Sequence, residues 1–348
     1  MGHHQTIARR RYALRADTRG ANLVEYMVVV GLIAILAMFG WRAFGSRVDA
    51  SAEAQARCIE TFSCAAGVPT HADGQPLLGA AAMPARPSGG RPDFGGAENP
   101  DLAGDFEGAT YQTLDGEVSI TGAGEDRGFD ESDVSQGDLA DCYLAAALAE
   151  LALRDPAVLE KAVRDNGDGT FTVTFYEKGV WWWEPDYYPV EITVSGDFPR
   201  KADGTWVYMK PGDDGREMWP MIIEKAYAQW EGGGDYADIE QGNATVPMEA
   251  LTGRDADATT DYRSIYDRWE RGEAITLLTP DMSDHSKQKA LYANGTLLFN
   301  HYYYVVGVDR QAGTVTVRNP WGWDKGTTVL KIEDVEKHFE HMATGPTR

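Results

Sequence analysis

Residues 136–143 read Gln-Gly-Asp-Leu-Ala-Asp-Cys-Tyr, and the cysteine of this stretch opens the apolar run CYLAAALAELA, Cys142 to Ala152. Alanine and leucine favour a helix, and a run that is apolar nearly all round predicts a buried one. A cysteine at the start of a helix has a physical reason to ionise, because the free amide N–H groups and the helix macrodipole stabilise a thiolate.

Two residues further along the chain complete a familiar chemical set. His301 lies in NHYYYVV and Asn319 in RNPWG. A cysteine, a later histidine and then an asparagine suit the nucleophile, base and base-orienting residue of a papain-type site. Each also has a structural interpretation: a core thiol, a core histidine, and a turn residue before Pro320. His285, in the polar segment SDHSKQK, is a competing base whose setting suits solvent better.

The composition excludes one class of function. The chain has 348 residues, 43% of them hydrophobic, and a formal net charge of −22. It therefore lacks the basic surface that neutralises nucleic-acid phosphates, and we expect no nucleic-acid partner. The acidic residues are concentrated between Asp93 and Asp141, either as a solvated acidic linker or, in part, as a calcium-binding segment.

The cysteines are Cys58, Cys64 and Cys142. An odd number in an exported protein predicts one bridge and one free thiol. We expect Cys58 to pair with Cys64 and Cys142 to stay free. Three unpaired thiols are the alternative.

An apolar segment near the N-terminus predicts a membrane anchor. The run Met27 to Trp41 is apolar and follows a basic stretch, residues 1–20. Flanking apolar residues extend it to a transmembrane helix over residues 21–45. Basic residues before the segment place the N-terminus in the cytoplasm. We therefore expect a single-pass inner-membrane protein with its following domain in the periplasm or outside the cell.

The same segment resembles the leader of Flp-type prepilins, which are cleaved after a glycine and carry Glu-Tyr soon afterwards. Here Gly20 precedes ANLVEY, and Glu25 is the fifth residue after Gly20. The resemblance implies cleavage after Gly20 by a prepilin peptidase and, with Glu25 inside an apolar helix, a pilin-like assembly. The alternative is a plain anchor whose Glu25 reaches the membrane interface.

The rest of the chain divides into a linker and an ordered domain. Residues 46–115 are rich in Ala, Gly and Pro and predict a flexible linker. Residues 116–348 predict an α+β fold with two lobes. The helical lobe carries Cys142, and the β-rich lobe carries His301 and Asn319, with the site in a cleft between them. The expected elements include a helix at 157–164, a turn in DNGDG, strands in FTVTFYEKG and at 188–194, a helix at 219–230, strands in EAITLLT, TLLFNHYYYVVGVDR and GTVTVRNPW, and a last helix at 332–341.

Several blocks of this domain resemble the protease core of the calpain family. They are DVSQGDLADCYLAAALAELA, WPMIIEKAYAQWEGG, the histidine segment, VRNPWG and KIEDVEKHF, in family order. The resemblance implies that Cys142 is the nucleophile, His301 the base, Asn319 its orienting residue and Gln136 a donor to the oxyanion. It also implies that Trp321 shields the Asn–His hydrogen bond from water.

The chain departs from the family pattern at three positions near the site. Ala140 and Tyr143 stand where the family usually has Gly and Trp, and Tyr302 stands where it usually has Ala. We expect the two tyrosines to narrow the cleft. None of these changes removes a reacting group.

The family also implies two calcium-binding loops. Asp133 matches an acidic ligand of the first loop and Gly128 a backbone ligand, but Thr205 replaces its glutamate. Lys325 replaces the glutamate of the second loop, and a lysine is no calcium ligand. We therefore expect a weakened first site, no second site and no required cofactor.

The expected function is that of a membrane-tethered, calpain-like cysteine endopeptidase that hydrolyses protein substrates. Two alternatives use the same residues differently. One is a pilin-like structural or binding protein with an inactive protease fold. The other is a peptidyl transferase that uses the Cys142 thiol.

Overall fold

The structure is a computed structural model, and it describes residues 99–103, 106, 108–113, 128–179, 186–212, 217–281 and 296–347. All of these belong to the second of two compact units, residues 80–348. The predicted leader and membrane helix lie outside the described residues, as do most of the predicted linker and His285. Gly20, Glu25, Cys58 and Cys64 therefore remain sequence predictions.

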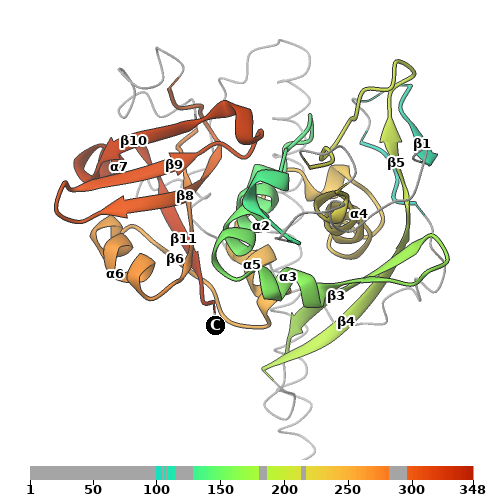
Figure 1. The fold of residues 1–348 in the computed structure, drawn as a ribbon, viewed down its shortest axis with the longest axis horizontal. Helices are drawn as coiled ribbons and strands as arrows, with labels where there is room; N and C mark the ends of the chain where they lie inside the picture. The colour runs from blue at the N-terminus through green and yellow to red at the C-terminus, as the bar shows by residue number, and fades with distance from the viewer. Residues whose placement is uncertain are drawn as a thin grey trace, which may run out of the picture. The chain divides into compact units, whose positions relative to one another are not determined.

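Four helices build one half of the domain, which we call the helical half. They are α2 (Cys142–Arg154), α3 (Pro156–Ala162), α4 (Trp219–Trp230) and α5 (Thr245–Thr252). In Figure 1, α2 lies between α4 and the strands drawn in red. Every α2 residue from Tyr143 to Ala152 is buried, which confirms the predicted buried helix. Pro156 forces the boundary between α2 and α3, because proline fits only the first turn of a helix.

Two small antiparallel sheets also belong to the helical half. One has the order β2 (Val163–Asp165), β3 (Thr170–Lys178) and β4 (Tyr187–Ser195). The predicted DNGDG turn joins β2 to β3, and Gly167 and Gly169 there have φ of 76° and 85°. The second pairs β1 (Thr110–Thr113) with β5 (Asp197–Arg200).

The β1 strand corrects the predicted linker, which was expected to run to residue 115. Two further contacts tie residues before β1 to the domain. The backbone N–H of Ala103 donates to the Tyr208 hydroxyl at 2.9 Å, and the backbone of Asp101 forms an isolated parallel β-bridge with that of Asp235. The folded domain thus includes the described residues between 99 and 113. Composition alone missed this, because the partners of the segment lie far away in the sequence.

A six-stranded antiparallel sheet forms the other half, which we call the sheet half. Its order is β10-β9-β8-β7-β11-β6. The strands are β6 (Asp257–Thr259), β7 (Ala274–Leu278), β8 (Tyr302–Asp309), β9 (Thr314–Arg318), β10 (Thr327–Lys331) and β11 (His341–Gly345), with helices α6 (Ile265–Glu270) and α7 (Ile332–His338) packed beside them. Short 3₁₀ turns occur at η1 (Glu131–Asp133), η2 (Ala237–Ile239), η3 (Tyr262–Ser264) and η5 (Trp323–Lys325).

The end of the chain differs from the predicted last helix. That helix stops at His338 rather than residue 341, and the chain turns into β11. Strand β11 enters the sheet between β7 and β6 and pairs with both. These long-range backbone hydrogen bonds outweigh the helical pattern that continues past His338.

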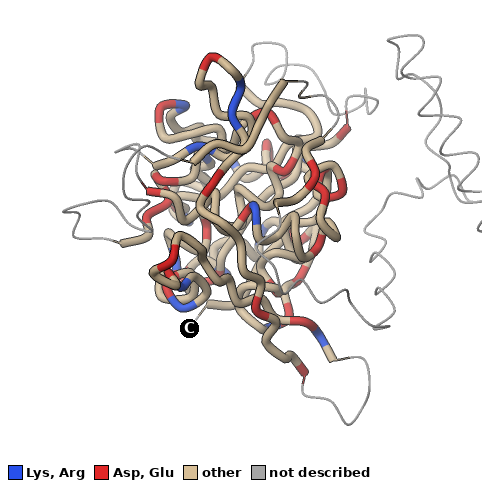
Figure 2. Tube along the Cα trace, turned by 90° about the vertical axis from the view of Figure 1, so that its right-hand side faces the viewer, with Lys and Arg blue, Asp and Glu red and all other residues tan. Residues whose placement is uncertain are grey.

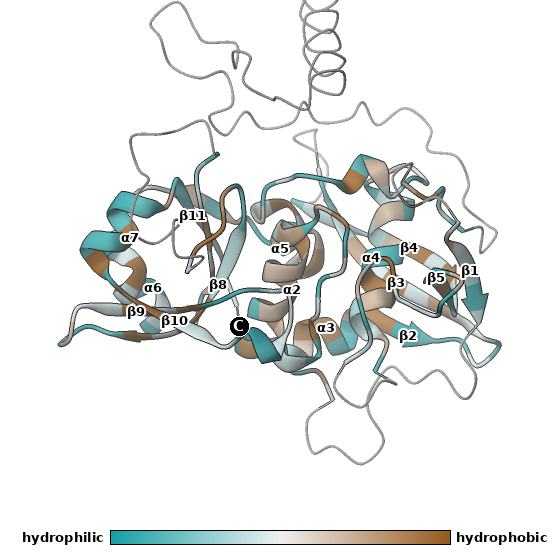
Figure 3. Cartoon of the chain, turned by 90° about the horizontal axis from the view of Figure 1, so that it is seen from above, coloured by the Kyte–Doolittle hydropathy of each residue, from teal (hydrophilic) through white to brown (hydrophobic). Residues whose placement is uncertain are grey.

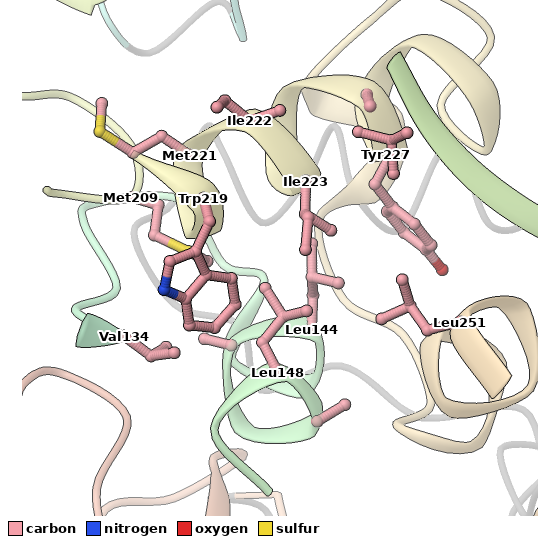
Figure 4. Packing of buried hydrophobic residues seen from close by; sticks show 14 of the residues in the cluster. Val134, Leu144, Leu148, Met209, Trp219, Met221, Ile222, Ile223, Tyr227 and Leu251 are labelled. Carbon is pink, nitrogen blue, oxygen red and sulfur yellow. The ribbon is translucent and has the colours of Figure 1, made fainter. Parts of the chain in front are cut away.

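The domain has two apolar cores, and the first extends from the helical half to Ala274, Tyr302, Tyr304 and Ala343 of the large sheet. Figure 4 shows the first, where Leu144 and Leu148 of α2 meet Trp219 and Ile223 of α4. The second lies between the large sheet and its two helices and includes Val317. In Figure 3 apolar residues, in brown, recur along the central helices α2 and α4. Figure 2 shows acidic residues outnumbering basic ones along the described chain.

The described residues thus form a mixed helix-and-sheet domain. None of their helices is long and apolar enough to cross a membrane.

Candidate active site

The three predicted reacting residues sit at the ends of elements. Cys142 is the first residue of α2, His301 directly precedes β8 and Asn319 directly follows β9. Strands β8 and β9 are antiparallel neighbours, with Tyr304 opposite Arg318. The first residues of β8 and the last residues of β9 therefore lie side by side at the same end of these two strands, which brings His301 and Asn319 together.

His301 and Asn319 are joined by a hydrogen bond. The His301 Nε2 to Asn319 Oδ1 distance is 2.9 Å, and the same oxygen accepts the backbone N–H of Trp321 at 3.0 Å. A backbone N–H donor at this atom identifies it as the amide oxygen rather than the nitrogen, so His301 Nε2 must donate to it. The imidazole therefore carries its proton on Nε2, and Nδ1 keeps a lone pair that can accept one.

The backbone around His301 is held by a residue that the sequence analysis did not single out. The backbone N–H of His301 donates to Thr279 Oγ1 at 2.9 Å, and Thr279 N–H donates to the His301 carbonyl at 3.0 Å. Thr279 directly follows β7, the neighbour of β8. Asn300 adopts φ 48°, a left-handed conformation that starts β8 later than the alternating sequence predicts.

Two aromatic rings cover the imidazole. The rings of Trp321 and Tyr303 each lie 5.2 Å from it, centroid to centroid, in edge-on geometries. His301 is 6% exposed, whereas Trp321 is 41% exposed. Trp321 therefore covers the histidine while its own outer face meets solvent.

Cys142 is a free, partly buried thiol beside this pair. The backbone N–H groups of Tyr302 and Tyr143 act to lower the pKa of its thiol. Cys142 and His301 line the same cleft. The amides of the first helical turn add to the stabilisation of negative charge there.

Burial opposes either charge when it forms alone. It raises the pKa of the Cys142 thiol to about 11 and lowers the pKa of the His301 imidazole to about 4. Transfer of a proton from sulfur to Nδ1 creates both charges together. Opposite unit charges attract each other, by on the order of 4 kcal/mol for a generic pair about 4 Å apart at an intermediate dielectric constant, and such an attraction opposes the desolvation of both groups.

A cleft of about 590 Å³ contains these groups. This is the size of a binding site for a short segment of chain or a small molecule. Both halves line it, through Gln136, Gly137, Asp138, Leu139, Ala140, Cys142, Tyr143, Lys210, Gln241, Gly242, Leu278, Asn300, His301, Tyr302, Trp321 and Lys325.

Gln136 lines the cleft, and its side-chain amide already has internal partners. Its Nε2 donates to the Leu139 carbonyl at 2.7 Å and to Asp141 Oδ1 at 3.1 Å. Its backbone N–H donates to the Pro320 carbonyl at 2.9 Å, which ties the segment to the sheet half. An oxyanion would have to share or replace one of the two side-chain bonds, and the longer one, to Asp141, is the weaker.

Ala140, Tyr143 and Tyr302, which differ from the residues expected from the family resemblance, fit the local structure around the cleft. Tyr143 is buried, and its hydroxyl donates to the Ile239 carbonyl at 3.1 Å. The Tyr302 hydroxyl lies 3.0 Å from His341 Nε2. Both tyrosines contribute to the cleft wall, as does Ala140, while the hydroxyl groups are fixed elsewhere.

The described residues do not fit the calcium loops that the family resemblance implies. Asp133 Oδ2 accepts two N–H groups, from Trp219 Nε1 and from the Asp130 backbone, each at 2.8 Å. N–H donors at that oxygen compete with a cation. Lys325 pairs with Asp324 at 2.9 Å, and Thr205 supplies no carboxylate. Within the described part of the chain, Gly128 and Asp133 included, no cluster of three acidic, histidine or cysteine side chains could hold a metal ion.

Comparison with known proteins agrees with this geometry. The calpain family cysteine protease model matches residues 124–335. Mouse (Mus musculus) calpain-9 is 28% identical over 242 residues, 62% of this chain and 33% of the relative. The calpain-2 catalytic subunit of Rattus norvegicus is 27% identical over 213 residues, 56% and 28% of the two chains. Calpain clp-1 of Caenorhabditis elegans is 29% identical over 211 residues, 56% and 25%.

The shared region thus spans a third or less of these relatives' length. The family model itself covers more than half of the present chain and includes Cys142, His301 and Asn319. The chain belongs to the calpain family of cysteine proteases.

Proposed function

We propose that this protein is a cysteine endopeptidase with a papain-like two-lobed site, in which Cys142 attacks peptide bonds of protein substrates. The observation that carries the proposal is the 2.9 Å bond from His301 Nε2 to Asn319 Oδ1. It leaves Nδ1 as the proton acceptor at a cleft that Cys142 also lines. An inactive protease fold would have no need to hold the imidazole in that tautomer.

The reaction follows from these positions. As the Cys142 sulfur bonds to the substrate carbonyl carbon, its proton moves to His301 Nδ1. The imidazolium then protonates the leaving amine nitrogen as the C–N bond breaks, which leaves a thioester. Water, deprotonated by His301, attacks the thioester and returns the thiol. Throughout, Asn319 accepts the Nε2 proton and keeps the ring in place.

The tetrahedral oxyanion needs donors near the sulfur. The backbone N–H of Cys142 and the Gln136 side-chain amide are the proposed donors. Removing one such donor typically lowers the rate about 10²–10³-fold. Trp321 limits the access of water to the Asn319–His301 bond, which strengthens that bond.

Turnover of the full chain tests the proposal. An unfolded, fluorogenically labelled protein is the substrate, and Cys142→Ala and His301→Ala are compared with the parent. We expect both variants to lose at least about 10⁴-fold in rate. Mass spectrometry of the products identifies hydrolysis, since water adds 18 Da, whereas joined peptides would indicate acyl transfer. Equal turnover by parent and Cys142→Ala contradicts the proposal.

We further propose that residues 1–45 tether this protease to the inner membrane, with its domain outside the cytoplasm and its leader cleaved after Gly20. The support is sequence alone: the basic stretch, the apolar run and Glu25. The intact mass of the protein from its native membrane tests it. A mature N-terminus at Ala21 supports a pilin-like leader and a prepilin peptidase as partner, and an N-terminus at Met1 or Gly2 contradicts it.

A further inference from the structure

Two lysines line the cleft from different halves of the domain. Lys210 lies between β5 and α4 in the helical half, and Lys325 ends η5 in the sheet half. Of the described residues that line the cleft, Asp138 is the only other one with a full charge at neutral pH, because burial lowers the pKa of the His301 imidazole to about 4. Neither lysine takes part in the reaction sequence above.

The segments that carry the two lysines are joined by hydrogen bonds through Ser135. The backbone N–H of Lys210 donates to the Ser135 carbonyl at 2.9 Å, and Ser135 Oγ donates to the Trp321 carbonyl at 3.3 Å. The backbone N–H of Lys325 donates to the Gly322 carbonyl at 3.2 Å, which closes the loop that begins at Trp321. Both lysines therefore belong to the end of the cleft at which Trp321 lies.

Two aspartates and a third lysine add to the charges at this end. Asp138 pairs with Lys201 at 3.2 Å, and Asp324 pairs with Lys325 at 2.9 Å. The hydrogen bond from Lys325 and, to a smaller extent, the charge of Lys210 lower the pKa of Asp324. These five side chains together carry one net positive charge, whereas the whole chain carries −22.

The loop that carries Lys325 also exposes two tryptophans. Trp321 is 41% exposed and Trp323 is 45% exposed, and Val329 is the only other exposed large apolar side chain in the part of the chain that the structure describes. The Arg318 guanidinium lies 3.5 Å from the centre of the Trp323 ring, which supports one face of that ring. Exposed aromatic rings beside a cleft offer contact area to apolar parts of a ligand.

We propose that Lys210 and Lys325 are specificity-determining residues, and that they make the cleft select protein segments with Asp or Glu near the bond that is cut. A substrate carboxylate can pair with either ammonium group while its apolar neighbours lie against the tryptophans. The net charge of the whole chain predicts the opposite preference, for basic substrates. At an ionic strength of about 0.15 M the Debye length is about 8 Å, so distant acidic groups are screened far more than lysines in the cleft wall.

Cleavage of matched peptides by the full chain tests this proposal, which rests on the proposed protease function. The peptides share one cleaved bond, identified by mass spectrometry, and carry three Glu, three Gln or three Lys on one side of it. A second set carries them on the other side. In at least one set, kcat/KM for the Glu peptide should exceed that for the Gln peptide by about 5-fold, and the Lys peptide should be cleaved most slowly. Equal values in both sets, or a preference for Lys, contradict the proposal.

Charge reversal identifies the residues responsible. Lys210→Glu and Lys325→Glu should each lower the ratio of kcat/KM for the Glu peptide to that for the Gln peptide, and the double variant should invert the preference. Lys337→Glu is the matched control, because Lys337 is an exposed lysine on α7 that does not line the cleft. Its ratio should equal the parent's. A parental ratio in the double variant, or an equal fall in Lys337→Glu, contradicts the assignment.

Peptide binding to Cys142→Ala provides a readout that does not depend on turnover. The Kd values of the same peptides, measured by fluorescence anisotropy, should rise in the order Glu, Gln, Lys. Identical Kd values for the three peptides overturn the proposed selectivity. A parent that cleaves none of the peptides would instead reject the proposed protease, while the order of the Kd values would still decide whether the cleft selects acidic segments.

Discussion

The helical half and the sheet half both bury ionisable groups in their neutral forms, but the groups are of opposite kinds. The helical half buries carboxyl groups, and burial raises the pKa of Glu150 and Glu224. The sheet half buries imidazoles, and burial lowers the pKa of His301 and His341. The two halves should therefore lose stability in opposite directions of pH.

The signs follow from proton linkage. A buried carboxyl whose pKa is raised by folding contributes stability below its unfolded pKa and loses it as pH rises through the folded pKa. A buried histidine whose pKa is lowered contributes stability above about pH 6.5 and loses it as pH falls toward the folded value. The nucleophile and base thus come from halves with opposite pH responses.

The largest expected effect concerns Glu150. Above about pH 4.5 the unfolded state releases the proton that folded Glu150 keeps, so the parent loses up to about 1.4 kcal/mol per pH unit from this group. Glu150→Gln removes that slope and retains an acceptor for Val305 N–H. Between pH 6 and pH 8 the variant should therefore gain stability relative to the parent, because folding raises the pKa of the Glu150 carboxyl. Urea unfolding of the full chain measures this, and a difference that is independent of pH contradicts it.

The next effect concerns the orientation of the base. Asn319→Ala removes the acceptor of the His301 Nε2 proton and of the Trp321 backbone N–H, so the ring can adopt the other tautomer. We expect kcat/KM to fall about 10²-fold, within the range of general base catalysis. Asn319→Gln serves as the control that keeps an amide but displaces it. An Asn319→Ala enzyme within about 3-fold of the parent would show that the hydrogen bond does not orient the base.

A smaller effect tests the acid side of the comparison. His301 has a folded pKa of about 4, so the parent should lose about 2 kcal/mol between pH 6.5 and pH 5 that a His301→Gln variant does not lose. The same urea series measures it. Glu150→Gln should retain the parent's loss of unfolding free energy as pH falls below 6.5. His301→Gln should retain the parent's loss of unfolding free energy as pH rises. Interchanged slopes would refute the assignment of pH responses to the two halves.

The smallest effect concerns calcium. Because Asp133 Oδ2 already accepts two N–H groups and the Lys325 ammonium pairs with Asp324, addition of calcium or of a chelator should change the rate of the full chain by less than about 2-fold. A large activation by calcium would show that the two halves need an ion to align.

Local sequence signals predicted many of the elements. The apolar helix beginning at Cys142 and the helix Trp219–Trp230 have the expected starts, because their patterns are long and unambiguous. The alternating strand β3 likewise follows from its own residues. The family resemblance supplied the pairing of His301 with Asn319, which the antiparallel register of β8 and β9 explains.

What the sequence analysis missed depends on partners distant in the chain. Strands β1 and β11 are short and exist through pairing with β5, β6 and β7. Thr279 is an ordinary residue until β8 lies beside it.

The most direct test of the central claim is mass spectrometry of the acyl-enzyme. The full chain is mixed with an activated peptide ester, quenched in acid within the first turnover, and mapped by proteolysis. A thioester should be found on the peptide that contains Cys142, should accumulate before product reaches its steady rate, and should be absent in Cys142→Ala. Turnover without an adduct, or an adduct on another residue, would contradict the assignment of Cys142 as the nucleophile.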